Sequence, residues 1–168
     1  FFRYGGPVGY EKLRLELATF YSKNSVSYKQ DQFILTNGSA GAIELISKTI
    51  IDPGDIVIAE SPTFSGTLRT FRGYGANVLP VEIDSDGMNV EHLEYLLVNN
   101  QSKKIKLVYT ISNFHNPTGA YLSYERRKHL IALSRKHNFL ILDDDAYGEI
   151  NFTNGSVAPL RDLDSFGN

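Results

Sequence analysis

Short apolar runs alternate with amphipathic stretches along most of the chain, and this alternation constrains the fold more than any other feature of the sequence. The apolar runs predict buried strands at 33–36, 56–59, 78–81, 107–110 and 139–142. Apolar residues at helical spacing predict helices at about 11–21, 40–50, 65–71, 90–97 and 123–137. A helix between successive strands makes right-handed βαβ units. The sequence therefore predicts an α/β fold with three layers, α/β/α, in which a mostly parallel sheet is covered on both faces.

Composition and charge exclude several classes of function. The 168 residues carry 17 Lys and Arg against 19 Asp and Glu, a formal net charge of −2, which gives no strong attraction to nucleic acid or to an anionic membrane. The chain has no Cys, which excludes disulfides, thiolate metal sites and cysteine nucleophiles. No apolar run approaches the ~20 residues that span a bilayer, and neither end resembles a targeting segment. We therefore expect a soluble, cytoplasmic protein.

Ligands of open α/β sheets bind beyond the carboxyl ends of the strands, so the segments that follow the predicted strands are candidates for a site. Gly38-Ser39-Ala40 opens a helix, where backbone N–H groups could hold a phosphate; the alternative is an ordinary Ser N-cap. Phe64 could stack on a planar ligand, or it could simply cap the core. Asn116 is restricted by Pro117, so its amide could bond a ligand oxygen; the alternative is a tight turn.

The last predicted strand ends on adjacent acids, Asp143, Asp144 and Asp145. Because neighbours in an extended segment point to opposite faces, Asp144 is expected to face away from the other two. Carboxylates this close repel one another, so a compensating cation is expected, either Mg²⁺ or a protonated ring nitrogen. The basic runs Lys103-Lys104 and Arg126-Arg127-Lys128 are predicted to be solvated faces. No ligand spacing relates the histidines, which are His92, His115, His129 and His137.

Taken together, the candidate segments resemble one family. In chain order they are Tyr4-Gly5-Gly6-Pro7-Val8-Gly9, Asn37-Gly38-Ser39-Ala40, Glu60-Ser61-Pro62-Thr63-Phe64, Asn116-Pro117-Thr118-Gly119 and Asp144-Asp145-Ala146-Tyr147. Their order and spacing resemble class I/II aminotransferases, the fold-type I enzymes that depend on pyridoxal phosphate (PLP). Within that family, the segments 109–117 and 144–149 look most like the branch of 2-aminoadipate and aromatic aminotransferases.

The resemblance implies a role for each matching position. Asp144 matches the carboxylate that pairs with the pyridine nitrogen of PLP, which keeps that nitrogen protonated and makes the ring an electron sink. Tyr147 and Asn116 match the two donors to the ring 3′-oxygen, and Phe64 matches the aromatic side chain that stacks on the ring. The cradle for the 5′-phosphate is matched by Gly38, Ser39 and Ala40. Tyr4 matches a hydroxyl that reaches the phosphate of the neighbouring subunit, which implies a homodimer with a shared site.

One family feature has no counterpart in the sequence. The lysine that binds PLP as a Schiff base stands in a Ser-x-Ser-Lys-type loop beyond the Asp-x-x-Tyr segment. No lysine follows Tyr147 here, and the last one is Lys136. We therefore expect residues 1–168 to be a partial large domain, without the N-terminal arm, the lysine segment or the C-terminal small domain, that does not catalyse transamination by itself. The alternative is a naturally short binding module.

For the parent protein, the resemblance implies an aminotransferase that moves an amino group between an amino acid and a 2-oxo acid. The same architecture also forms the PLP-binding effector domain of GntR-type transcriptional regulators, although Asn116-Pro117-Thr118-Gly119 resembles the enzymes more closely. A Mg²⁺-dependent phosphatase or kinase could use the acids at 143–145, but the sequence shows no phosphate-handling Lys or acidic partner loop for it.

Overall fold

The computed structural model describes residues 5–22, 26–100, 104–152 and 158–164 and divides into two compact units, Phe1–Ala42 and Ile43–Asn168. The first unit contains α1 (Glu11–Tyr21), the short 3-10 helix η1 (Gln30–Gln32) and the first turn of α2 (Gly38–Ile50). Aromatic rings pack together in this unit. Phe33 stacks on Tyr21 with ring centroids 6.1 Å apart and meets Tyr28 edge-on at 5.9 Å.

Residues 33–36 do not form the strand that the sequence predicts. Phe33 is extended, at φ −117° and ψ 133°, and Leu35 N donates to Val8 O at 3.1 Å. A single contact of this kind is not a ladder, and no strand in the described residues pairs with this segment. The prediction is wrong because a strand depends on a pairing partner as well as on local propensity.

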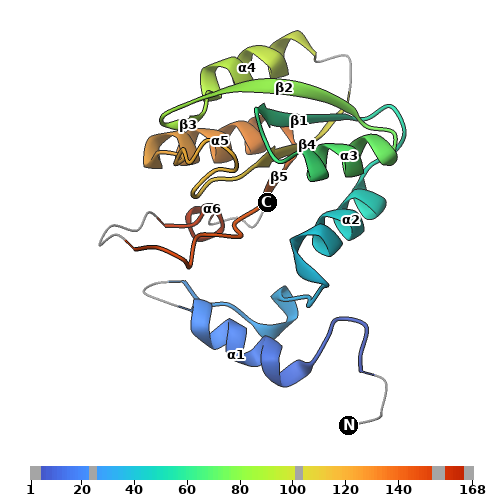
Figure 1. Ribbon diagram of the computed structural model, residues 1–168, viewed down its shortest axis with the longest axis vertical. Coiled ribbons are helices and arrows are strands. Elements are labelled where there is room, and N and C mark those ends of the chain that lie inside the picture. Colours follow the sequence, from blue (N-terminus) through green and yellow to red (C-terminus); the bar gives the residue numbers. More distant parts are fainter. Residues whose placement is uncertain (1–4, 23–25, 101–103, 153–157, 165–168) are drawn as a thin grey trace. The chain divides into compact units, whose positions relative to one another are not determined.

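The second unit is built on a sheet in the order β3-β2-β1-β4-β5 (Figure 1). β1 (Ile56–Ser61) lies between β2 (Asn77–Asp84) and β4 (Ile105–Thr110), and β4 pairs with β5 (Leu140–Asp143). These pairings are parallel, whereas the short β3 (Gly87–Met88) turns back antiparallel to β2. The mostly parallel sheet is confirmed. The antiparallel pairing escaped prediction because two residues carry no strand pattern.

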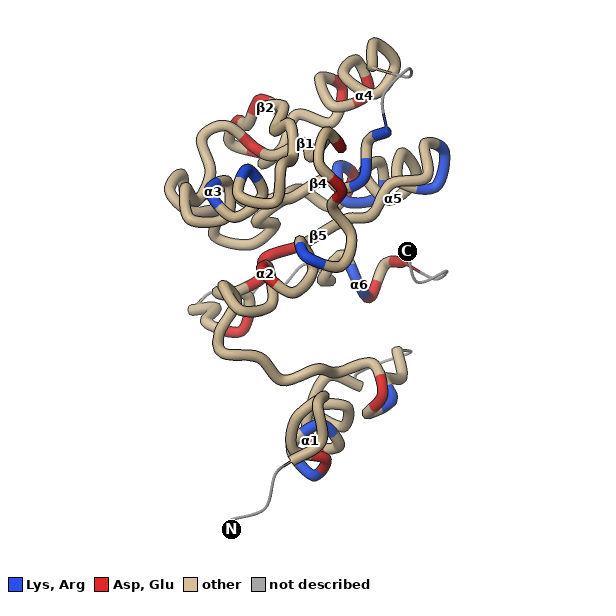
Figure 2. Tube along the Cα trace, turned by 90° about the vertical axis from the view of Figure 1, so that its right-hand side faces the viewer, with Lys and Arg blue, Asp and Glu red and all other residues tan. Residues whose placement is uncertain are grey.

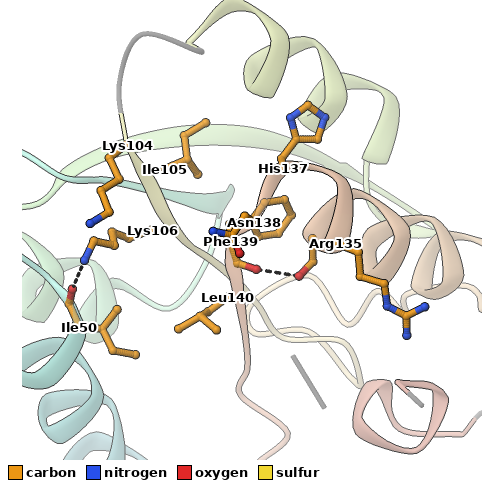
Figure 3. Close-up of a pocket in the computed structure, with 10 residues that line it drawn as sticks. Ile50, Lys104, Ile105, Lys106, Arg135, His137, Asn138, Phe139 and Leu140 are labelled. Carbon is orange, nitrogen blue, oxygen red and sulfur yellow. Dashed lines mark hydrogen bonds between the residues drawn. The ribbon is translucent and has the colours of Figure 1, made fainter. Parts of the chain in front are cut away.

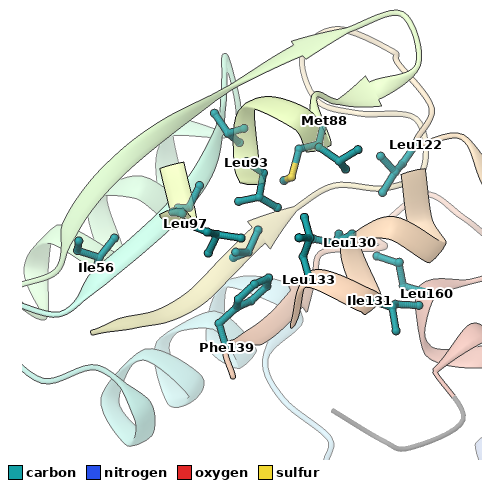
Figure 4. Packing of buried hydrophobic residues seen from close by; sticks show 14 residues of the cluster. Ile56, Met88, Leu93, Leu97, Leu122, Leu130, Ile131, Leu133, Phe139 and Leu160 are labelled. Atoms are coloured by element: carbon teal, nitrogen blue, oxygen red, sulfur yellow. The ribbon is translucent and has the colours of Figure 1, made fainter. Parts of the chain in front are cut away.

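Helices cover both faces of this sheet, which confirms the three layers. α4 (Val90–Asn99) and α5 (Tyr124–His137) lie on one face, and α3 (Ser65–Gly73) lies on the other (Figure 1). Alternate residues of β1 serve the two sides: Ile58 packs into the core beneath α4 and α5, and Val57 packs into the core beside α3. The first of these cores is drawn in Figure 4, where the helices contribute Leu93, Leu97, Leu130 and Leu133.

The short helix α6 (Leu160–Leu163) adds Leu160 to the core beneath α4 and α5. Among the residues that the structure describes, no helix combines the length and the apolar character that a membrane crossing needs.

Candidate functional site

The carboxyl ends of β1, β4 and β5 lie at one edge of the sheet, because these strands are parallel neighbours. Predicted site residues follow each of these ends: Phe64 after β1, Asn116 after β4 and Asp144 directly after β5. The topology therefore brings the segments that carry them to the same edge, where open α/β sheets bind their ligands.

The acids at the end of β5 point alternately to the two faces of the sheet, as the sequence predicts. Asp143 and Asp145 accept hydrogen bonds from the loop that follows β4, at donor distances of 3.1, 2.8 and 2.7 Å. Asp144 Oδ2 instead accepts from the hydroxyl of Tyr109 at 2.9 Å, on the side of the sheet that faces α3. Asp144 is thus set apart from the other two carboxylates and has a donor of its own.

Asp144 ends a chain of hydrogen bonds that begins on α3. Thr67 Oγ1 donates to the hydroxyl oxygen of Tyr109 at 3.2 Å, and that hydroxyl donates to Asp144. Tyr109 is fully buried, with its ring 5.6 Å from that of Phe71. Burial, and then the negative charge of Asp144, raises the pKa of the Tyr109 hydroxyl. The hydroxyl therefore stays protonated, and its bond fixes the direction of the carboxylate.

Arg127, which lies on the opposite face of the sheet from Asp144, corrects one prediction. The run Arg126-Arg127-Lys128 is not wholly a solvated face, because Arg127 on α5 is fully buried. Its guanidinium donates to Leu122 O at 2.8 Å, to Ser112 O at 2.9 Å and to Asn113 Oδ1 at 2.7 Å. Arg127 therefore holds the loop that follows β4 against α5.

Two of the carboxylates share the surroundings of Arg127. Burial lowers the pKa of the Arg127 guanidinium, and the charges of Asp143 and Asp145 oppose that change. Burial also raises the pKa of Asp143 to about 6, although hydrogen bonds from Ser112 act in the opposite direction. On this face the compensating cation is an arginine of the chain. In the described parts of the chain, no Lys, Arg or His lies within ion-pair distance of Asp144.

A second buried polar cluster, which the sequence reasoning missed, links the ends of β1 and β4. Glu60 Oε1 accepts from Thr110 Oγ1 at 2.8 Å, and Oε2 accepts from Ile111 N at 2.9 Å. Oε2 also lies 3.1 Å from His115 Nε2, and both side chains are buried. Glu60 lies on the same face of β1 as Ile58, so the alternation of that strand was the available signal that this carboxylate points inward.

The other predicted residues of this unit are accessible. Phe64, at the N-cap of α3, has 44% of its surface exposed, and Tyr147 has 41% exposed. Asn116 is half-buried and precedes a cis peptide bond to Pro117. Among the described residues, no hydrogen bond joins Phe64, Asn116 and Tyr147 to one another or to Asp144. Their segments share an edge of the sheet, and each side chain remains open to a ligand.

Gly38, Ser39 and Ala40 form the exposed first turn of α2. Gly38 has φ +69°, and Thr36 Oγ1 donates to Gly38 O at 2.9 Å, so the backbone turns sharply into the helix. The first turn carries no acidic residue, so nothing there repels an anion from its N–H groups. This turn belongs to the first unit, and Tyr4 lies outside the described residues.

A cavity of about 610 Å³ lies at the amino ends of β4 and β5, the edge of the sheet opposite the acids (Figure 3). Lys104, Lys106 and Leu140 are among its lining residues, and Lys106 Nζ donates to Ile50 O at 3.0 Å. Because of its position, this cavity is separate from the candidate site.

Positive and negative side chains are distributed unevenly over the helices that the structure describes. Lys and Arg gather along α5, whereas acids lie on α4 (Figure 2). Within the described segments, no group of His, Asp and Glu side chains is arranged to hold a metal ion.

The chain resembles proteins of one known family over almost all of its length. The family model for aminotransferase class I and II matches residues 1–165. The chain belongs to this family. It is 35% identical to aromatic-amino-acid aminotransferase 1 of Thermococcus litoralis, over 98% of this chain and 40% of that protein. It is 28% identical to 2-aminoadipate transaminase of Thermus thermophilus, over 96% and 38%, respectively. The predicted resemblance to this branch of the aminotransferases is confirmed.

Another relative of this aminotransferase chain is named as a transcriptional regulator rather than as an enzyme. The chain is 30% identical to an uncharacterized HTH-type transcriptional regulator of Bacillus subtilis, over 98% of this chain and 34% of that protein.

Among solved structures, the chain resembles the kynurenine aminotransferase of Pyrococcus horikoshii in complex with PMP, with a TM-score of 0.87 and 33% identity over 99% of this chain and 42% of the other. The chain thus spans about two fifths of the length of the aminotransferases it matches.

Proposed function

We propose that the protein containing this chain is an aminotransferase that uses PLP to move an amino group between an amino acid and a 2-oxo acid. The observation that carries the proposal is Asp144, a half-buried carboxylate at the carboxyl end of β5 whose partner is the Tyr109 hydroxyl rather than a cation. A carboxylate held in this way favours the protonated form of a ring nitrogen placed against it. Membership of the aminotransferase family supports the same assignment.

The residues present fit the cofactor. Asp144 would hold its ring nitrogen, Phe64 would stack on the ring, and Asn116 and Tyr147 would donate to its 3′-oxygen. The first turn of α2, at Gly38-Ser39-Ala40, would bind the phosphate through its N–H groups. When bound, the cofactor supplies an electron sink for the charge that develops on the substrate Cα. Tyr109 would keep the Asp144 carboxylate oriented toward the ring nitrogen during that change.

We also propose that the chain forms part of the PLP-binding large domain. The aminotransferases it matches are longer, and the chain covers about two fifths of each. The lysine that binds the cofactor covalently and the residues that select the substrate would come from the rest of the protein. Tyr4 would reach the phosphate of a neighbouring subunit, so the complete site would be shared across a homodimer.

The second candidate is a PLP-binding effector domain of a GntR-type transcriptional regulator. The relative from Bacillus subtilis, which is named as an HTH-type regulator, favours it. Both candidates predict cofactor binding through Asp144, so the two differ in turnover rather than in binding. A full-length protein that binds PLP and operator DNA but does not turn over amino acids would favour the regulator.

The test is substitution of Asp144 in the full-length protein. We expect Asp144→Ala to lower the transamination rate by about 100-fold or more, because it removes a charge that acts on the reacting ring. The matched control is Asp145→Ala, which removes the neighbouring acid on the opposite face and should change the rate only a few-fold. Both variants should have the circular dichroism spectrum of the wild-type protein, which shows that they fold. Near-normal turnover of Asp144→Ala would refute the proposed role.

A further inference from the structure

We propose that Glu60 and His115 form a buried clamp that fixes the position of Asn116, and that both are positioning residues for its amide. The inference rests on the proposed function, in which Asn116 contacts the cofactor. His115 directly precedes Asn116 in the chain, so any movement of the histidine backbone carries the amide with it.

The clamp contacts both nitrogen atoms of the His115 imidazole. Nε2 lies 3.1 Å from Glu60 Oε2, within ion-pair distance of the carboxylate when the imidazole is protonated, and that carboxylate is the group the nitrogen faces. Nδ1 lies 2.9 Å from Thr118 Oγ1, a hydroxyl on the far side of the same loop. Both His115 and Glu60 have side chains that are 1% exposed, so water does not compete for these contacts.

The backbone of the loop closes on the same residue. His115 N donates to Ala120 O at 2.9 Å, and Gly119 N donates to His115 O at 2.6 Å. Asn116, Pro117 and Thr118 lie inside this closed turn. Ser112 and Asn113 attach the start of the loop to β5 and α5, whereas the imidazole attaches this closed turn to Glu60 of β1, and Asn116 is the residue that follows it.

Glu60 is itself held rigidly. Its two oxygens take hydrogen bonds from Thr110 Oγ1 and Ile111 N at the end of β4, so the carboxylate has one orientation. A buried group of this kind costs desolvation, and apolar side chains of similar volume often stabilise a fold equally well. The arrangement is better explained by the need for a defined loop geometry than by the need for stability.

The test uses the full-length protein with His115→Leu, and with Glu60→Gln as a second variant that preserves volume. In the protein without cofactor, the amide of Gly119 should exchange with deuterium about tenfold faster in both variants, because the loop has lost its attachment. With cofactor, the dissociation constant for PLP should rise about tenfold, and the visible absorption of the bound cofactor should change its pH midpoint. His115→Gln, whose amide can replace Nε2 as the partner of Glu60, should restore most of both properties.

The control is His129→Leu, which should leave exchange and cofactor binding unchanged. It removes a half-exposed histidine whose Nε2 lies 3.7 Å from Glu94 on the outer helices.

A double-mutant cycle with Asn116→Ala separates the clamp from a general loss of stability: the effect of His115→Leu on the pH midpoint should vanish when the amide is absent. If the wild-type protein binds no PLP, the proposed function fails, and the exchange of Gly119 still tests the clamp. Unchanged exchange in both clamp variants, or an equal midpoint shift with and without Asn116, would overturn the inference.

Discussion

Replacement of Arg127 by Met should destabilise the protein far more than the same change at Arg126, its neighbour in the sequence. Arg127 donates three short hydrogen bonds, of 2.7 to 2.9 Å, to buried oxygens of Leu122, Ser112 and Asn113. Met preserves the volume of the stem but removes the donor to Leu122 O and Asn113 Oδ1, and it leaves Ser112 O with Leu122 N as its remaining donor, at 2.9 Å. At about 1 to 1.5 kcal/mol for each lost bond, the free energy of unfolding should fall by about 3 to 5 kcal/mol.

Arg126 provides the matched comparison, because it pairs with Asp84, which is about half exposed, at 2.6 and 2.8 Å. Arg126→Met should therefore lower the free energy of unfolding by about 1 kcal/mol or less. Urea unfolding of the full-length protein followed by circular dichroism measures both changes, provided that the slope with denaturant stays the same. A loss of about 1 kcal/mol or less for Arg127→Met, or equal losses for the two variants, would refute the reasoning.

Two further predictions concern the strand ends. Because the pKa of Asp143 is raised to about 6, the folded state holds its proton more tightly than the unfolded chain, so the wild type should lose stability as pH rises from 4 to above 6. Between pH 4.5 and 7.5 the wild type should lose about 2 kcal/mol through this group, and Asp143→Asn should remove that loss. Urea unfolding of both proteins at the two pH values measures it, and an equal change of stability with pH in the two proteins would contradict it. Tyr109→Phe removes the donor to Asp144 and should weaken PLP binding about tenfold while Thr67→Ala, one bond further away, weakens it less. Fluorescence titration with PLP measures both, and equal affinities in wild type and Tyr109→Phe would contradict the role of the hydroxyl.

Most of the second unit could be predicted because its strands are short, apolar and separated by helices. The strand predicted at 56–59 is β1, with little change in its bounds. The alternation of the three acids between the two faces of the sheet followed from the extended backbone at the end of β5. The strand expected at 33–36 failed for a different reason. Local propensity cannot supply the neighbour that a ladder requires, and no described strand pairs with that segment.

The buried polar residues were harder to predict, although the sequence carried a signal for each. Arg127 lies three, four and seven residues before Leu130, Ile131 and Ser134, which are buried on α5. Helical periodicity therefore placed Arg127 on the inward face, but its charge and its basic neighbours suggested a solvated surface. Glu60 was concealed in the same way, because a carboxylate at the end of an apolar strand resembles the start of a loop.

The alternation of the acids after β4 and β5 makes the site sensitive to chain length rather than to composition. The pairing of Asp143 with Thr110 sets which acid meets Tyr109 and which ones share the surroundings of Arg127. Deletion of one residue within β5 would turn each acid to the opposite face of the sheet. Asp144 would then face Arg127, and one of the two acids that lie near Arg127 in the present structure would face Tyr109. Two chains with the same acids could thus differ completely in chemistry. The register of β5 against β4 therefore determines the site as much as any of its side chains does.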